Sequence, residues 1–203
     1  MSVEGAEPGM ARPGGRTARV REAVLRAAGD ALAEQGLDRL DLADVARRAE
    51  VGKTTVYRRW STTAGLVADL LTDMAEQSVP RVDTGSLAED LKANARLVVR
   101  TLTDARQGPL FKAVIAAATC DVRTAEALHR FYAVRVKEWS GCVDAAVERG
   151  ELPAGTDAGE VIRAVSAPLY YRLLASGDPL DEAAADRAAE AAVAAARAGA
   201  YVI

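Results

Sequence analysis

The chain has 203 residues, half of them hydrophobic and few of them aromatic, and a formal net charge of −3. This length allows one large domain or two small ones, and the abundance of Ala, Leu, Arg and Glu favours helices over strands. Cys120 and Cys142 form no CxxC pair, and one histidine leaves no dense metal cluster, so we expect reduced thiols, no metal and no cofactor. No segment resembles a membrane span or a signal peptide, so we expect a cytoplasmic protein without a membrane partner.

The N-terminal part is more basic than the rest. Residues 1–60 hold 11 Lys and Arg against 9 Asp and Glu, whereas the remainder holds 15 against 20. Residues 1–16 are rich in Gly and Pro and are expected to form a disordered basic arm, which either touches DNA or is an inert tail. A mildly basic head on an acidic body suits a polyanion-binding head, although charge alone favours ordinary surface charge.

Apolar periodicity predicts nine helices, and hence an all-α fold. We expect a DNA-binding head over residues 17–62 and a helical body over residues 63–203, with helix 4 linking head to body. Pro80 to Gly85 breaks the helical pattern after helix 4 and marks a domain boundary. Thr62 is expected to cap helix 4. The expected helices cover 17–35, 42–49, 53–59, 62–74, 86–104, 110–119, 122–149, 157–175 and 181–198.

Asp41 to Trp60 is typical of a helix-turn-helix motif. Asp41 is a suitable N-cap, and Glu50 to Gly52 interrupts the apolar pattern, with Gly52 expected to relax the backbone. The following helix exposes basic, hydroxyl and aromatic side chains that can bind phosphates and base edges, while Trp60 packs inward. The candidate DNA-binding residues are Arg16, Asp41, Gly52, Lys53, Thr54, Thr55, Tyr57, Arg58, Arg59 and Thr62. At least one of the last two arginines is expected to point away from DNA.

The order Val51, Lys53, Thr55, Val56, Tyr57, Arg58, Arg59 and Trp60 resembles the DNA-binding domain of tetracycline-repressor (TetR) family regulators. The resemblance covers residues 17 to about 75 with specific motifs and is looser beyond. Glu50 stands where the family usually has Gly, Gly52 where Ser or Thr commonly caps the recognition helix, and Thr63 where a Lys commonly meets a phosphate. The resemblance implies a transcriptional regulator, more often a repressor, with an inducer bound in the C-terminal body.

Most aromatic residues lie in the expected body helices, where they either surround a ligand cavity or only fill the core. With the resemblance, we expect Phe111, Phe131, Trp139 and Tyr170 as walls and Arg135 as a polar contact. The scarcity of charge among them favours a largely apolar or aromatic effector. We expect helix 4 and the 110–119 helix to transmit its binding to the head.

The last two helices carry apolar and small residues at helical spacing. Their pattern fits either burial within one chain or a four-helix bundle between two chains. One recognition helix reads few base pairs, so the helix-turn-helix favours a homodimer on a palindromic operator in double-stranded DNA. The candidate interface residues are Val161, Val165, Leu169, Leu173, Ala184, Ala188, Ala191 and Ala195.

Enzymatic chemistry has little support in the sequence. There is no Gly-rich phosphate loop, no HExxH and no G-x-S-x-G, and a lone helical histidine such as His129 is usually structural. We therefore predict a sequence-specific DNA-binding regulator without catalytic residues. The alternative is a helical small-molecule-binding protein that has lost specific DNA binding, which Glu50 and Thr63 make conceivable.

Overall fold

The computed structural model describes residues 15–77 and 81–203. In this part of the chain the fold is all-α, with nine α-helices and no strand, as the sequence predicts. Residues 1–14 of the expected arm lie outside the described residues. The helices are α1 (Gly15–Gln35), α2 (Leu42–Arg48), α3 (Lys53–Arg59), α4 (Thr63–Glu76), α5 (Leu87–Thr103), α6 (Gln107–Ala118), α7 (Val122–Glu148), α8 (Ala158–Tyr171) and α9 (Glu182–Arg197), with the short turns η1 (Leu37–Arg39) and η2 (Arg172–Ser176).

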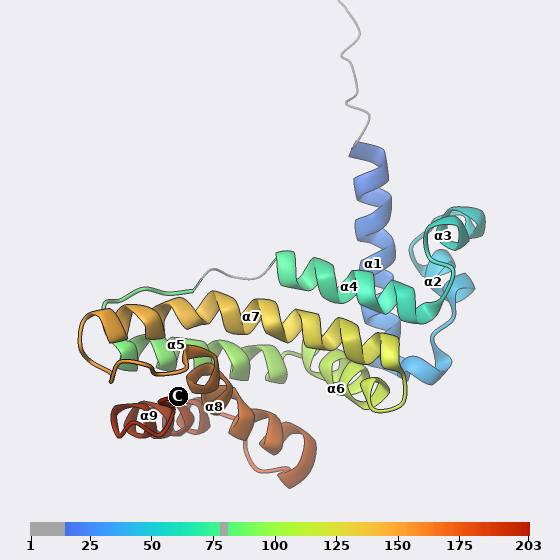
Figure 1. Ribbon diagram of the computed structural model, residues 1–203. Coiled ribbons are helices and arrows are strands. Elements are labelled where there is room, and N and C mark those ends of the chain that lie inside the picture. Colours follow the sequence, from blue (N-terminus) through green and yellow to red (C-terminus); the bar gives the residue numbers. More distant parts are fainter. Residues whose placement is uncertain (1–14, 78–80) are drawn as a thin grey trace, which may run out of the picture.

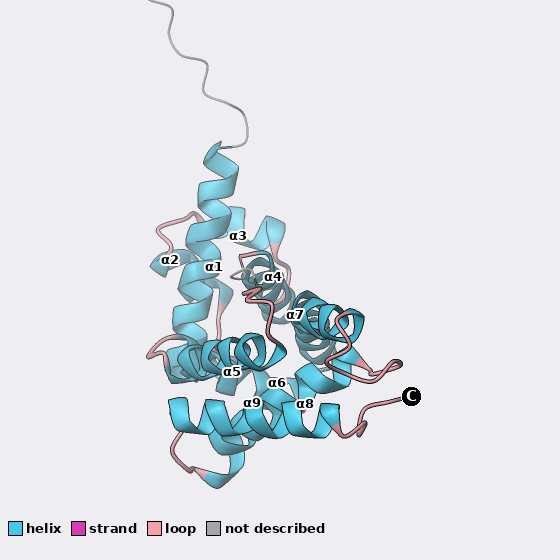
Figure 2. Cartoon of the chain, turned by 90° about the vertical axis from the view of Figure 1, so that its left-hand side faces the viewer, coloured by secondary structure: helices cyan, strands magenta, loops and turns pink. Residues whose placement is uncertain are grey.

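The long helix α7 is the axis of the molecule (Figure 1). Helix α4 packs along one side of α7, and α5 and α8 pack against it elsewhere. Helices α1, α2 and α3 gather at one end, while α9 packs on α5 and α8 at the other (Figures 1 and 2). The helices of the expected head, α1 to α3, therefore lie at the opposite end of the helical framework from α9.

The first of two apolar cores joins the head to the neighbouring end of the body. It contains buried side chains of α1 to α4, including Val56 and Trp60, and extends to Leu110 and Phe111 of α6 and to Phe131 of α7. Two short helices bury too little surface to be stable alone, so α2 and α3 depend on this shared core. This apolar core therefore continues across the domain boundary that the sequence predicts after residue 62.

The second core lies between α5, α7, α8 and α9 and corrects the interface prediction. Five of the candidate interface residues are buried in it within a single chain and have no free surface to offer a partner. Their spacing marks the inner faces of α8 and α9. Ala191 is exposed, and Ala195 and Leu173 are half-buried. The five buried residues are Val161, Val165, Leu169, Ala184 and Ala188.

Helix ends differ from the expected ones where side chains or prolines intervene. Helix α1 begins at Gly15, so Arg16 belongs to a helix and not to the arm. Helix α6 begins at Gln107, because Asp104 accepts from the backbone N–H groups of Arg106 and Gln107, and Pro109 fits a first turn whose N–H groups need no helical acceptor. Helix α8 contains Pro168 and passes at Arg172 into a π-helical turn.

The turn between α2 and α3 has its strain at an unexpected residue. Glu50 has a φ of 55°, the left-handed region that favours glycine. Gly52 has ordinary angles, φ −59° and ψ 132°, so the expectation that Gly52 relaxes the backbone is wrong. The left-handed turn gives a physical reason for the glycine that TetR-family proteins usually carry at the position of Glu50.

Candidate nucleic-acid interface and effector cavity

Helix α3 presents a polar face to solvent and an apolar face to the head. Val56 and Trp60 are buried, while Lys53, Thr54, Tyr57, Arg58 and Arg59 are exposed and Thr55 is half-buried. The ring of Tyr57 is 48% exposed. The exposed set combines cations, hydroxyls and a ring on one short helix, the chemistry that binds phosphates and base edges.

Two of the cations on this face are uncommitted. Within the described residues, neither Lys53 nor Arg58 forms an ion pair. Arg59 instead lies 3.9 Å from Asp69 of α4, with its guanidinium carbon 5.2 Å from the centroid of the Trp60 ring. Arg59 is thus the arginine held towards the protein, and Lys53 and Arg58 remain available to a polyanion.

Two of the candidate DNA-binding residues act as helix caps. The Asp41 carboxylate accepts from the backbone N–H of Asp44 at 3.0 Å, and the Thr62 hydroxyl accepts from Gly65 N–H at 3.1 Å. Asp44 in turn pairs with Arg47 and Arg48 of the same helix. These arginine hydrogen bonds hold the pKa of Asp44 below its ordinary value. Gly52 provides no side-chain cap, so α3 begins without one.

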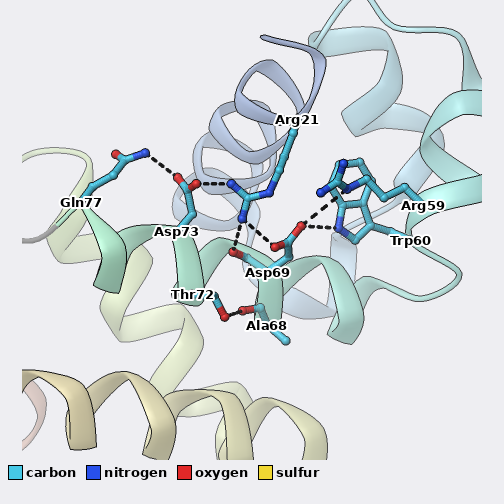
Figure 3. Close-up of polar contacts among 8 residues, drawn as sticks. All are labelled: Arg21, Arg59, Trp60, Ala68, Asp69, Thr72, Asp73 and Gln77. Carbon is cyan, nitrogen blue, oxygen red and sulfur yellow. Dashed lines mark hydrogen bonds and ion pairs between the residues drawn. The ribbon is translucent and has the colours of Figure 1, made fainter. Parts of the chain in front are cut away.

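A polar network ties α3 and α1 to α4 (Figure 3). Trp60 Nε1 donates to Asp69 at 3.0 Å, and Arg21 of α1 donates to the other oxygen of Asp69 at 2.7 Å. Arg21 also pairs with Asp73, and these carboxylates, Asp69 foremost, raise the pKa of the guanidinium. We call Arg21, Trp60, Asp69 and Asp73 the α4 latch. It couples the end of the recognition helix to the helix that enters the body.

A small cavity of about 90 Å³ lies between α5, α7 and α8. Three of the four expected wall residues, Phe131, Trp139 and Tyr170, line it, and so does Arg135, the expected polar contact. Phe111 does not; it lies behind the wall, with its ring centroid 5.5 Å from that of Phe131. Its place is in the first core, where 98% of its surface is removed from solvent.

Sequence reasoning missed the polar lining of this cavity. Asn94 and Tyr132 also line it. The side-chain atoms Asn94 Oδ1 and Trp139 Nε1 are buried without a hydrogen-bond partner in the described part of the chain, whereas the hydroxyl of Tyr132 interacts with that of Tyr170. A buried polar group without a partner costs roughly 1–3 kcal/mol. The detectable signal was an asparagine on the apolar stripe of α5, between Leu91 and Val98.

Burial also shapes the titration of the cavity. It raises the pKa of Tyr132 and of Tyr170, so both phenols stay neutral at physiological pH. Their rings meet edge to face, with centroids 5.6 Å apart. Among the described residues that line the cavity, Arg135 is the charged one, and it pairs with Glu138 at 2.8 Å.

A larger cleft of about 400 Å³ adjoins the cavity at the junction of head and body. Side chains of α1, α4, α5 and α6 line it, including Leu25, Met74 and Leu110. Helix α6 also reaches the head through an ion pair between Arg106 and Asp30, and Arg106 donates to the carbonyl of Arg26 at 3.0 Å. Helices α4 and α6, the expected transmitters, therefore both border the cleft.

Neither a metal site nor a membrane span is found in the part of the chain that the structure describes. No group of three His, Cys, Asp or Glu side chains could hold a metal ion there. No described helix combines the length and apolar character needed to cross a bilayer.

The fold and the exposed face of α3 define a helix-turn-helix regulator that binds DNA. Family models agree: residues 24–70 match the model "Bacterial regulatory proteins, tetR family", and residues 81–192 match "Tetracyclin repressor-like, C-terminal domain". The chain belongs to the TetR family of transcriptional regulators. Regulators of this family bind DNA and act as dimers.

Individual relatives point the same way. The uncharacterized HTH-type transcriptional regulator YdeS of Bacillus subtilis (strain 168) is 34% identical over 79% of this chain and 81% of its own length. The DNA-binding transcriptional repressor TetR of Mycobacteroides abscessus is 34% identical over 79% and 85%. The crystal structure of the TetR-family regulator SCO0332 has a TM-score of 0.70 at 28% identity, over 87% and 97% of the two chains.

Proposed function

We propose that this regulator is a cytoplasmic repressor that binds a palindromic operator as a homodimer and leaves it when a small apolar or aromatic effector binds in the body. The observation that carries the DNA-binding part is the exposed face of α3. There Lys53, Tyr57 and Arg58 are free to meet DNA, while Val56 and Trp60 anchor the helix from behind. We retain all the candidate DNA-binding residues from the sequence. Among them, Asp41 and Thr62 act as helix caps, and Arg59 is held towards α4.

The outer faces of α8 and α9 support the homodimer. Pro168 and Tyr171 of α8 are exposed, Tyr171 to 63%, and Leu174 of the following turn η2 is 47% exposed. Helix α9 adds exposed alanines, including Ala191 and Ala194. An apolar, small-residue surface of this kind suits packing against its own copy. The interface we propose therefore lies on the outer faces of these helices, opposite the buried residues first expected.

The route from effector to DNA runs through α4 and α6. An effector shifts the equilibrium only if it binds the DNA-competent and DNA-incompetent dimers with different affinities. The α4 latch attaches α3 to α4, and Arg106 attaches α6 to α1, so a shift of either helix moves the head. A solved SmeT–triclosan complex shares the fold, with a TM-score of 0.64 at 19% identity over 87% of this chain and 90% of the other.

The second candidate function is effector binding without specific DNA binding. Glu50 favours it, because this exposed carboxylate stands in the turn directly before the recognition helix, where it repels phosphate. In that case the cavity still binds an effector, but α3 recognises no specific DNA sequence.

Selection of binding sites from random duplex DNA tests the proposal. The purified full chain should enrich a palindrome, and Tyr57→Ala should lose it. A suitable control is Thr72→Ala, because Thr72 lies exposed on α4 and bonds only to its own helix. Failure of the wild type to enrich any site, at low salt and without effector, would reject the repressor and favour the second candidate.

A further inference from the structure

The cavity and the cleft are adjacent parts of one space. Leu97, Thr101 and Arg135 line both. On α5, residues Asn94, Leu97, Val98 and Thr101 follow helical spacing, so one face of α5 leads from the cavity to the cleft. The inner volume of about 90 Å³ is less than the 150 Å³ or so of an engineered cavity known to bind benzene, so it holds only the end of a ligand.

The inner end of this space, the cavity, can bind a group that both donates and accepts hydrogen bonds. Trp139 Nε1 only donates, and Asn94 Oδ1 only accepts. Both atoms are buried without partners within the described residues, and both residues line the cavity. A hydroxyl group matches them, because one oxygen both accepts from an indole N–H and donates to an amide oxygen.

The outer end, the cleft, offers apolar contacts, and its described charged side chains are all paired. Leu25 of α1, Met74 of α4 and Leu110 of α6 line the cleft. Each charged side chain that lines the cleft or the cavity already has a partner of opposite charge; these pairs are Glu22 with Arg26, Asp73 with Arg21, Arg106 with Asp30, and Arg135 with Glu138. An ionised ligand would have to compete with these pairs, whereas a neutral one leaves them intact.

We propose that cavity and cleft form one elongated site for an uncharged aromatic ligand with a hydroxyl group at its inner end. The inference rests on the proposed effector-controlled regulator and names the chemistry of its effector. The ligand's hydroxyl lies between Asn94 and Trp139, and its ring system extends past Thr101 towards α1 and α4. Such a ligand touches the head directly, through Leu25, as well as the body.

The probes that test this site are 2-naphthol, naphthalene and 2-naphthoate, which differ in one substituent. With the full-length protein, 2-naphthol should bind about tenfold or more tightly than naphthalene, since only the phenol supplies the missing hydrogen bonds. The anionic 2-naphthoate should bind more weakly than 2-naphthol. Equal affinity of 2-naphthol and naphthalene, or tighter binding of 2-naphthoate, overturns the inference.

The two indole N–H resonances of 15N-labelled protein provide a local readout. Among the described residues the indole N–H of Trp139 has no hydrogen-bond partner, whereas that of Trp60 bonds to Asp69, so 2-naphthol should move the Trp139 signal downfield and leave the Trp60 signal in place. The variant Trp139→Phe assigns the signal. If Trp139→Phe fails to fold, Asn94→Leu tests the same site, because it should abolish the shift. An unmoved Trp139 signal at saturating 2-naphthol contradicts the site.

Variants separate the inner from the outer end. Asn94→Leu should reduce the preference for 2-naphthol over naphthalene. The matched control is Ser166→Ala, because Ser166 also lines the cavity but already donates to carbonyls of its own helix. Met74→Trp, which fills the cleft, should weaken both aromatic probes. Unchanged affinity in Met74→Trp rejects the extension into the cleft.

The operator experiment keeps the two proposals apart. Specific DNA binding together with failure of 2-naphthol to bind the wild type rejects this inference and leaves the repressor in place. A Trp139 shift with 2-naphthol in a protein that enriches no DNA site supports this inference and rejects the repressor.

Discussion

The indole N–H of Trp60 donates a 3.0 Å hydrogen bond to Asp69, which joins the residue after the recognition helix to the first turns of α4. Asp69 also accepts from Arg21 of α1, so one carboxylate receives donors from two other segments (Figure 3). The orientation of α3 is thereby set by α4 as well as by apolar packing.

Asp69→Ala should destabilise the protein by roughly 1–3 kcal/mol, because it leaves a buried indole N–H without an acceptor and removes half of the Arg21 pairing. Denaturant unfolding measures the change. Thr72→Ala, on the exposed side of the same helix, should change stability much less. If Asp69→Ala lowered the free energy of unfolding no more than Thr72→Ala, the α4 latch would not stabilise the fold.

Glu50→Gly should stabilise the fold by about 1 kcal/mol, because glycine adopts a positive φ without the penalty of a side chain. It should also tighten DNA binding by removing a carboxylate near phosphate. Glu50→Gln separates the effects: it should improve DNA affinity at low salt without raising the melting temperature. A melting temperature raised equally by both variants argues against backbone strain at this turn.

Lys53→Ala and Arg58→Ala should weaken DNA binding across sequences, and each should lower the salt slope of log K by about 1, as expected for a lost phosphate contact. Titrations of one duplex at several salt concentrations measure the slope. Arg59→Ala should change the slope less, because Arg59 lies against Trp60 and Asp69. A larger slope change at Arg59 than at Arg58 would reverse the assignment of the two arginines.

Asn94→Leu should stabilise the free protein, by about 1 kcal/mol, because it replaces a buried acceptor without a partner by an apolar side chain of similar size. Thermal unfolding without ligand measures this gain. The same variant is expected to lose the preference for a hydroxyl-bearing probe, so stability and ligand recognition should change in opposite directions. A loss of stability would mean that Asn94 has a partner in solution.

Acid should destabilise the protein as pH falls below about 4. The pKa values of Asp104, Asp121 and Asp186 are held below the ordinary 3.8, by backbone N–H groups, by Thr124 and by Arg96 respectively. Because their folded pKa values are lower than the unfolded ones, the unfolded state binds more protons in this range, and stability is lost as pH falls. Asp186→Asn should flatten the pH dependence of unfolding measured between pH 5 and 2.

Thiol reagents should distinguish the two cysteines. Cys120 is exposed, whereas Cys142 is buried, and burial raises the pKa of the Cys142 thiol to about 11. At pH 7 a thiol-specific reagent should modify one site per folded chain and two after unfolding. Mass spectrometry should locate the first adduct at Cys120, and a first adduct at Cys142 would contradict this burial.

The sequence predicts the helices well because their apolar stripes and caps are local. Val56 and Trp60 anchor α3 as expected, and Asp41 and Thr62 cap the helices that follow them. Periodicity alone could not tell which apolar face of α8 meets its own chain, so Val165 was assigned to a partner when it packs inside. The polar lining of the cavity depends on long-range packing: only the fold brings Asn94 of α5 beside Trp139 of α7.

The first core has a consequence for hybrid regulators. Helices α1 to α4 share that core with α6 and the start of α7. If the head of another regulator replaced residues 17–62, its apolar side chains would therefore pack against Leu110, Leu128 and Phe131, to which they are not matched. A chimera that carries these facing residues along with the new head should retain both solubility and effector response. The transferable unit of this molecule is a packing unit, and it is discontinuous in sequence.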